Sequence, residues 1–137
     1  MFLLDTNVLS ELRRRDRTNP NVAVWADRVH ASDLFLSAIT ILEVEAGTLS
    51  LLRRDARQGA ILRNWIDGNV LPAFEGRILA VDTAVALRCA SLHVPNPRAE
   101  RDALIAATAL VHRLMVVTRN VTDFEPMGVG TLNPWNG

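Results

Sequence analysis

The segment Phe2-Leu3-Leu4-Asp5 begins with a short apolar run that stops at an acidic residue, and this pattern recurs along the chain. The other runs are residues 34–36 before Ser37, 78–81 before Asp82, and 114–117 before Thr118. Uninterrupted apolar runs of this length are typical of strands buried on both faces, as in a parallel sheet. The sequence therefore predicts four such strands, each ending at a polar residue.

Helical patterns long enough for crossover connections fill the segments between these runs. They cover residues 8–14, 20–31, 40–52, 54–70, 83–93 and 101–113, and a fifth short strand is expected near residues 131–132. This alternation predicts an α/β fold with a parallel four- to five-stranded sheet flanked by helices. The chain has 137 residues and no visible linker or repeat, so one domain over residues 1–137 is expected.

Composition excludes several classes of protein. The 15 basic and 15 acidic residues give a formal net charge of zero, which argues against a general polycation that coats nucleic acid. All the basic residues are arginine, so enzymes that need a catalytic or phosphate-binding lysine are excluded. The one cysteine, Cys89, excludes an intrachain disulfide and a zinc site of several thiolates. No signal peptide or membrane span is visible, so a cytoplasmic protein is expected.

Acidic residues gather at the predicted carboxyl ends of the strands, where sites form in parallel sheets. Asp5 closes the first run, and Asp102 lies in the first turn of a helix whose small apolar face packs inward. Glu43 lies about one turn into the helix after the second run, on its inward stripe. Asp123 follows the fourth run, and either it or Asn120 is the fourth member of this group.

A cation is expected among these carboxylates, because several of them close together repel one another. Ligands that are all oxygen suit Mg²⁺ or Mn²⁺ better than Zn²⁺. The remaining candidates have structural explanations. Asp82 is expected to be the N-cap of the following helix. His30, His93 and His112 show no metal-ligand spacing and are expected to be surface or structural residues.

Four segments in order along the chain carry a family resemblance. They are Leu3-Leu4-Asp5-Thr6-Asn7-Val8, Ser37-Ala38-Ile39-Thr40 with Glu43 and Gly47, Asp102 with Ile105-Ala106-Ala107 and Ala109, and Val117-Thr118-Arg119-Asn120. Together they resemble the PIN domain, and within it the VapC-like ribonuclease toxins of the FitB-like branch. The closing Asn133-Pro134-Trp135 also resembles that branch, so the resemblance covers essentially the whole chain.

The resemblance implies a magnesium-dependent endoribonuclease that is the toxin of a type II toxin–antitoxin pair. Asp5 and Asp102 would be the metal ligands, with Glu43 and Asp123 as further catalytic acids. In many relatives an aspartate follows the Thr-x pair, where this chain has Asn120. The resemblance also implies an RNA substrate, a VapB-like antitoxin as cognate partner, and a homodimer.

The mechanism expected from these residues is hydrolysis by a water that Mg²⁺, or Mn²⁺, orients and acidifies. Glu43 would hold a second ion or accept the proton of that water. The candidate substrate-binding residues are Thr6, Asn7, Thr118, Arg119 and Asn120. The arginine clusters at residues 13–17 and 53–57 either form a rim that binds phosphates or are solvated helix faces.

Apolar residues on two neighbouring predicted helices exceed the needs of one small core and predict a dimer surface. They are Leu49, Leu51, Leu52, Ile61, Leu62, Trp65 and Ile66. For each of them, packing in the core is the alternative.

Two other functions remain open. An aspartate-nucleophile phosphatase also ends its first strand in aspartate, but it needs a second aspartate where this chain has Asn7, and normally a lysine. A non-catalytic PIN-like subunit that binds an antitoxin or nucleic acid is the other alternative. The intact Asp5, Glu43 and Asp102 argue against a loss of activity.

Overall fold

Five parallel strands form one sheet in the order β3-β2-β1-β4-β5, in a computed structural model that describes residues 1–137 apart from the side chain of Arg15. The strands are β1 (Phe2–Leu4), β2 (Leu34–Ser37), β3 (Ile78–Leu79), β4 (Met115–Val117) and β5 (Thr131–Leu132). All four neighbouring pairs are parallel, so the predicted fold class and its fifth strand are confirmed. The third strand is shorter than the predicted run, because only two of its residues pair with β2.

Eight α-helices connect and cover the strands. They are α1 (Thr6–Leu12), α2 (Pro20–Arg28), α3 (Ala38–Arg54), α4 (Ala56–Trp65), α5 (Leu71–Ala73), α6 (Thr83–Leu92), α7 (Glu100–His112) and α8 (Val121–Phe124). The predicted helix over 54–70 differs from the structure in two ways. Asp55 ends α3 and begins α4, so residue 54 belongs to the preceding helix. Residues Ile66–Val70, at the end of the predicted range, form a π-helix. Helix α8 follows the fourth predicted strand, in a segment for which no helix was predicted. None of the helices described has both the length and the apolar character that crossing a bilayer requires.

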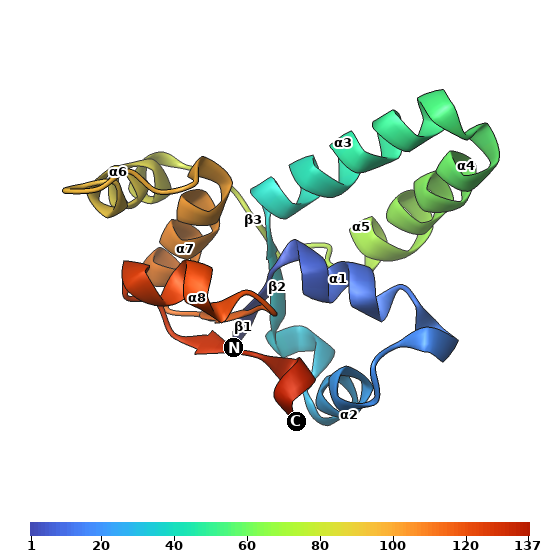
Figure 1. The fold of residues 1–137 in the computed structure, drawn as a ribbon, viewed down its shortest axis with the longest axis horizontal. Coiled ribbons are helices and arrows are strands. Elements are labelled where there is room, and N and C mark those ends of the chain that lie inside the picture. The colour runs from blue at the N-terminus through green and yellow to red at the C-terminus, as the bar shows by residue number, and fades with distance from the viewer.

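The central strands are buried on both faces, which explains their uniformly apolar sequences. Leu3 and Val116 belong to one core, which they form with residues of α6, α7 and α8. Leu4 and Val117 belong to a second core, which they form with residues of α1, α3 and the π-helix. Helices therefore cover both faces of the sheet, with α7 on one side and α1 and α3 on the other (Figure 1).

The strand order reverses between β1 and β4, and this reversal positions the candidate site. The chain runs outward from β1 to β2 and β3, and then returns to place β4 on the other side of β1. Leu4 is the register partner of Val117, and the N–H of Asp5 donates to the Val117 carbonyl at 2.9 Å. Asp5 and Thr118 consequently leave the sheet side by side, at the type of position where open α/β sheets bind ligands.

Helices α3 and α4 form a hairpin that projects from the domain (Figure 1). Of the predicted dimer surface, Ile66 is 1% exposed and belongs to the core, so its assignment to that surface is wrong. Leu49 and Ile61 are 52% and 50% exposed on this hairpin. The predicted homodimer itself stays a prediction.

Gly59 is required where α4 approaches α3. A Cβ atom at residue 59 would lie 2.6 Å from the Cα of Leu52, whereas one at Gly47 would meet nothing within 4 Å. We therefore expect Gly59→Ala to lower the free energy of unfolding by about 1–3 kcal/mol through overpacking. Gly47→Ala is the matched control and should raise it by about 0.4–1 kcal/mol. Urea denaturation measures both, and equal effects of the two substitutions would contradict the close approach.

Candidate active site

Asp5 is the most constrained acid of the site. Its Oδ1 accepts a hydrogen bond from the N–H of Thr6 at 2.8 Å, which makes it the N-cap of α1. Its Oδ2 accepts from Thr118 Oγ1 at 2.8 Å and from Asn7 Nδ2 at 3.2 Å. Burial raises the pKa of Asp5, and the charge of Glu43 adds to that rise, although the three hydrogen bonds oppose it. Asp5 therefore caps α1 through its Oδ1 and is at the same time a member of the acidic group.

Thr118, Asn7 and Asn120 form a network behind Asp5. Thr118 Oγ1 accepts from Asn7 Nδ2 at 3.3 Å and from the N–H of Asn120 at 3.0 Å while it donates to Asp5. Thr118 is fully buried. These contacts place Thr118 and Asn7 as groups that orient Asp5, and their predicted contact with substrate stays a prediction.

Glu43 reaches the same edge from α3. Thr6 Oγ1 donates to Glu43 Oε1 at 2.8 Å, and Arg101 Nη1 lies 3.8 Å from Glu43 Oε2. Glu45, two residues along α3, points elsewhere and pairs with Arg63, whose guanidinium lowers the pKa of Glu45. The inward position predicted for Glu43 agrees with the structure.

Asp102 lies in the first turn of α7 and completes the group. Neighbouring residues of α7, such as Ile105 and Ala106, are fully buried, as its inward face predicts. Burial raises the pKa of Asp102, and the charges of Asp5, Asp123 and Glu43 raise it further. No described side chain forms an ion pair with Asp102.

Two residues were candidates for the fourth acidic position. Asp123 is exposed at the start of α8, yet its charge contributes to the raised pKa of Asp102. Asn120 contacts the network through its backbone N–H, which donates to Thr118. The structure therefore gives Asp123 an electrostatic link to the acidic group and gives Asn120 a backbone link to it.

A divalent cation fits the donor chemistry of this edge. The donors are carboxylate oxygens, the ligands that Mg²⁺ and Mn²⁺ prefer. Arg101 is the one described cation that pairs with any of the four acids. Among the described residues, no three of these carboxylates bring an oxygen within 4.8 Å of one another. The negative charge of these four carboxylates exceeds the positive charge beside them. This excess is least favourable at Asp5 and Asp102, where burial raises the pKa.

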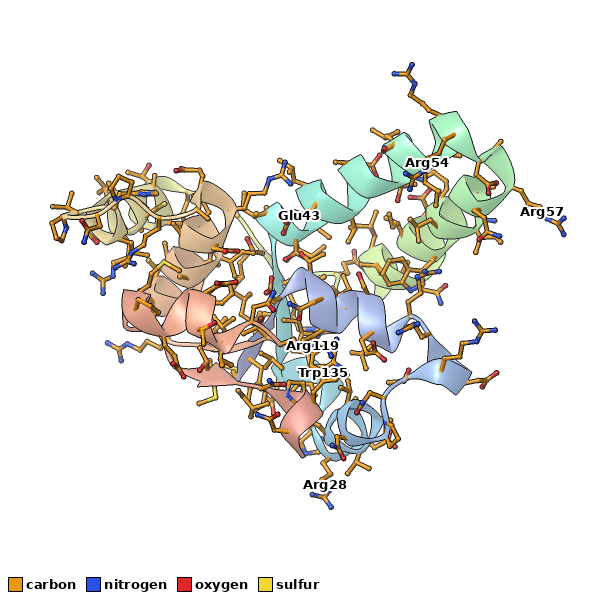
Figure 2. The ribbon with its side chains drawn as sticks, in the orientation of Figure 1. Arg28, Glu43, Arg54, Arg57, Arg119 and Trp135 are labelled. Carbon is orange, nitrogen blue, oxygen red and sulfur yellow. The ribbon has the colours of Figure 1, made fainter. Side chains whose placement is uncertain are left out.

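Arg119 is held beside the acidic edge. Its N–H donates to Asn7 Oδ1 at 3.2 Å, and its carbonyl accepts from Asn133 Nδ2 at 3.4 Å. Its guanidinium carbon lies 5.2 Å from the ring centroid of Trp135, a cation–π arrangement that Figure 2 shows near the centre of the molecule. Arg119 therefore has a fixed backbone and a guanidinium supported by an aromatic ring.

The predicted arginine clusters lie in different places. Arg54 and Arg57 lie at the far end of the α3–α4 hairpin (Figure 2). Arg54 is about 16.5 Å from Glu43 along α3, at about 1.5 Å per residue. That cluster therefore does not form a rim of the acidic edge. Arg13 lines a cavity together with Thr6 and Glu43. The cluster at residues 13–17 therefore does approach the acidic edge. The side chain of Arg15 lies outside the described residues.

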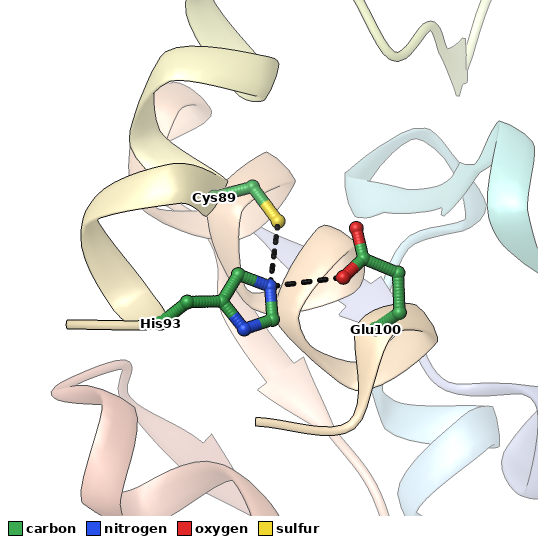
Figure 3. A group of neighbouring side chains, drawn as sticks. All are labelled: Cys89, His93 and Glu100. Atoms are coloured by element: carbon green, nitrogen blue, oxygen red, sulfur yellow. Dashed lines mark hydrogen bonds and ion pairs between the residues drawn. The ribbon is translucent and has the colours of Figure 1, made fainter. Parts of the chain in front are cut away.

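Cys89, His93 and Glu100 form a second group of polar side chains (Figure 3). Cys89 Sγ lies 3.7 Å and Glu100 Oε2 lies 3.0 Å from His93 Nε2. The N–H of Arg98 donates to His93 Nδ1 at 3.0 Å, so a neutral ring carries its proton on Nε2 and donates it to Glu100. A metal at Nε2 would move that proton to Nδ1, against the Arg98 N–H. The group is therefore structural and holds the loop between α6 and α7.

His30 and His112 are exposed, and His93 is structural. This agrees with the surface or structural roles predicted for the three histidines. Asp82 likewise caps α6, since it accepts from the N–H of Val85 at 3.0 Å. The proximity of Cys89 to His93 follows from their spacing of four on one helix, which sequence analysis did not use.

Three residues at the border of the site were not assigned a role from the sequence. Arg101 immediately precedes Asp102 in the first turn of α7, and that adjacency was the available signal. Trp135 supports Arg119, but no local pattern joins residues this far apart. Glu11 is buried and accepts from the N–H of Asn19 at 2.8 Å, a contact that lowers its pKa.

Known proteins resemble this chain in both sequence and structure. The sequence profile of the PIN domain matches residues 2–126. A curated relative, VapC ribonuclease Y4jK of Sinorhizobium fredii, is 36% identical over 140 residues and covers 98% of each chain. The crystal structure of FitAcB from Neisseria gonorrhoeae has a TM-score of 0.90 and 37% identity over 100% of both chains. A toxin–antitoxin complex from Klebsiella pneumoniae has a TM-score of 0.70 and 26% identity over 98% of each chain.

The acidic edge should destabilise the protein when divalent metal is withheld. Asp102 has a raised pKa, so the native state binds its proton more tightly than the unfolded state does. The free energy of unfolding therefore falls as pH rises from the ordinary value of 3.8 through the raised pKa. In EDTA, Asp102→Asn should be more stable than the parent at neutral pH, and this advantage should shrink toward pH 3.8.

Urea denaturation at several pH values measures this difference. Asp27→Asn, at an exposed position of α2, is the control and should show no such pH-dependent advantage. If Asp102→Asn is less stable than the parent at neutral pH in EDTA, the account of repelling carboxylates is wrong.

Proposed function

The chain belongs to the PIN-domain family, as its motifs predict, and on this premise we propose that it is a magnesium-dependent endoribonuclease that acts as a toxin. The observation that carries the proposal is the convergence of Asp5, Glu43 and Asp102 at one edge of the sheet, with the charge of Asp123 acting on Asp102. The relative named VapC ribonuclease supports RNA as the substrate. The proposed domain is a single PIN-like unit over residues 1–137.

In this proposal, Asp5 and Asp102 hold the cation. Bound Mg²⁺ neutralises charge on the scissile phosphate and acidifies water, while Mn²⁺ can replace it. Thr118 and Asn7 fix the Asp5 carboxylate through their hydrogen bonds to Oδ2. The chain thereby maintains one orientation of a carboxylate whose burial opposes its ionisation.

Glu43 is the proposed acceptor of the proton that the attacking water loses, or the holder of a second ion. Thr6 orients its Oε1, which leaves Oε2 with only the distant guanidinium of Arg101. A carboxylate with one oxygen positioned by a hydrogen bond, and the other accepting none from a described donor, is suited to proton transfer. Asp123 is a further acid that adds negative charge beside Asp102.

RNA must approach an edge that repels it, and Arg119 and Arg101 are the proposed phosphate contacts. Arg119 is exposed, and its guanidinium pairs with no carboxylate among the described side chains. Guanidinium groups bind phosphate oxygens through two parallel hydrogen bonds. Asn120 is the remaining proposed substrate contact, because its exposed side chain follows Arg119.

The proposed partners are a VapB-like antitoxin and a second copy of the chain. The structure solved from Klebsiella pneumoniae as a toxin–antitoxin complex supports the first. A homodimer is supported by the exposed Leu49 and Ile61 on the α3–α4 hairpin.

Asp102→Asn should lower the rate of cleavage of single-stranded RNA in Mg²⁺ by about 100-fold or more, and EDTA should abolish cleavage by the parent. Thr118→Val retains the size of the side chain but loses the hydrogen bond to Asp5, so a loss of about 10- to 100-fold is expected. Calorimetry should show weakened Mg²⁺ binding for Asp102→Asn. Circular dichroism should show an unchanged fold.

The matched control for this experiment is Asp27→Asn, which removes an exposed carboxylate far along the chain from the acidic edge. It should cleave RNA at the parent rate. If Asp102→Asn and Asp27→Asn are equally active, the acidic edge is not the active site. If the parent does not cleave RNA in Mg²⁺ or Mn²⁺, the alternative of a non-catalytic PIN-like subunit is favoured.

The products should carry a 5′-phosphate and a 3′-hydroxyl. The oxygen of water bonds to phosphorus, the bond from phosphorus to the 3′-oxygen breaks, and that oxygen takes a proton. The neighbouring 2′-hydroxyl takes no part, so replacing it with hydrogen at the cut site should slow the chemistry only modestly. End-group analysis of the cleaved RNA checks this. A 2′,3′-cyclic phosphate would show that the carboxylate mechanism is wrong.

A further inference from the structure

A cavity of about 350 Å³ lies between α2 and the C-terminal segment, outside the acidic edge. Its apolar walls are Val24, Trp25, Leu132 and Pro134. This volume is within the range of about 300–1,000 Å³ that is usual for sites that bind small molecules. It is large enough to admit a planar group beside the indole ring of Trp25.

The aromatic wall of this cavity is held in place. The ring of Trp25 meets that of Phe2 edge to face, with centroids 5.5 Å apart and an interplanar angle of 80°. Phe2 lies in β1, so the orientation of Trp25 is set by the central sheet. An aromatic ring fixed in this way is a suitable surface for stacking a nucleobase, because every base has a π-face.

Polar groups lie at the border of the cavity. Asn21 donates through Nδ2 to the carbonyl of Trp135 at 2.7 Å, and no described group donates to its Oδ1. Arg28 lines the cavity at the end of α2, is exposed, and forms no ion pair with a described side chain. In the view of Figure 2, the label of Trp135 lies between those of Arg119 and Arg28. A guanidinium that lines an apolar cavity is complementary to an RNA strand, with its phosphates outside and a base inside.

Residues that line the cavity are also hydrogen-bonded to residues at the acidic edge. The carbonyl of its wall residue Leu132 accepts from the N–H of Thr118 at 2.9 Å, and Thr118 in turn donates to Asp5. Asn133, another lining residue, donates through its side chain to the carbonyl of Arg119. Arg119 therefore lies beside a residue that lines the cavity, so an RNA strand bound at Arg119 is close to the cavity.

We propose that this cavity is a nucleobase subsite that binds one unpaired base of the RNA strand whose backbone contacts Arg119 and Arg28. The base stacks on Trp25, and its polar edge faces Asn21. This subsite rests on the proposed ribonuclease function and would determine which sequence is aligned with the acidic edge.

The test measures the dissociation constant of a short fluorescein-labelled single-stranded RNA in EDTA, where cleavage does not interfere. Val24→Glu places a carboxylate in the cavity wall, at a residue that is 48% exposed, and Arg28→Gln removes the guanidinium. Each should weaken binding by about tenfold, the typical loss for one stacked base or one phosphate contact. Leu87→Glu, on the exposed face of α6, and Arg57→Gln, at the hairpin tip, are the matched controls and should bind as the parent does.

A double-mutant cycle identifies the base. RNAs that lack a single base are titrated against the parent and against Val24→Glu. One abasic position should weaken binding to the parent by about tenfold and should have no further effect in Val24→Glu, because both changes remove the same contact.

The results of these experiments distinguish a failure of the proposed subsite from a failure of the proposed ribonuclease function. If the parent cleaves RNA but the cavity variants bind it as their controls do, the subsite is wrong and the ribonuclease assignment stands. If Val24→Glu leaves RNA binding unchanged but disrupts a protein complex in sedimentation, the cavity is a protein interface and the proposal is overturned. If the parent neither binds nor cleaves RNA, both proposals are wrong.

Discussion

The carboxylate of Asp5 is held from three directions, and the rest of the acidic edge is arranged around it. Thr6 donates from the first turn of α1, Asn7 from the next residue, and Thr118 from the end of β4. The last contact exists only because β4 returns to the side of β1, where the strand order reverses. One hydrogen bond between residues 113 positions apart therefore connects the topology of the sheet to the geometry of the site.

This arrangement has an electrostatic cost that the fold itself does not offset. Burial raises the pKa of both Asp5 and Asp102, and each acid makes the ionisation of its neighbours harder. The arginines that form close ion pairs are used elsewhere: Arg63 pairs with Glu45 and Arg14 with Glu11. A chain with zero net charge thus has a strongly acidic edge. A divalent cation would remove this cost, which connects the stability of the fold to the proposed chemistry.

The acidic edge and the group formed by Cys89, His93 and Glu100 differ in how their polar atoms are used in hydrogen bonds. At the acidic edge, the described donors reach some carboxylate oxygens and leave lone pairs available for a cation. At His93, a backbone N–H occupies Nδ1 and Glu100 accepts from Nε2, so both ring nitrogens are used within the chain. The cysteine, histidine and carboxylate at the second site are closer together, yet they are the less suitable ligands. Short distances between side chains are therefore not enough to identify a metal site, because the ligand atoms must also be free of other hydrogen bonds.

Local sequence patterns were enough to predict several features of the fold and the site. Apolar runs predicted the strands, since a strand buried on both faces must be apolar throughout, and strand ends predicted Asp5 and Thr118 at one edge. Helical spacing also predicted the inward position of Glu43. The shortened β3, the break at Asp55 and helix α8 were not predicted, because element boundaries depend on tertiary contacts.

The pairing of side chains from different elements depends on tertiary packing and could not be predicted from local patterns. Thr118 donates to the Asp5 carboxylate because the register of β1 and β4 places the two residues side by side, and Asn7 reaches the same carboxylate from α1. Trp135 supports Arg119 across a distance in sequence that no local pattern spans. Ile66 was assigned to a surface but is buried, since a helical pattern shows that a face is apolar and does not show what covers it. Periodicity fixes the direction of a side chain within its own element, and the packing of elements fixes its partner.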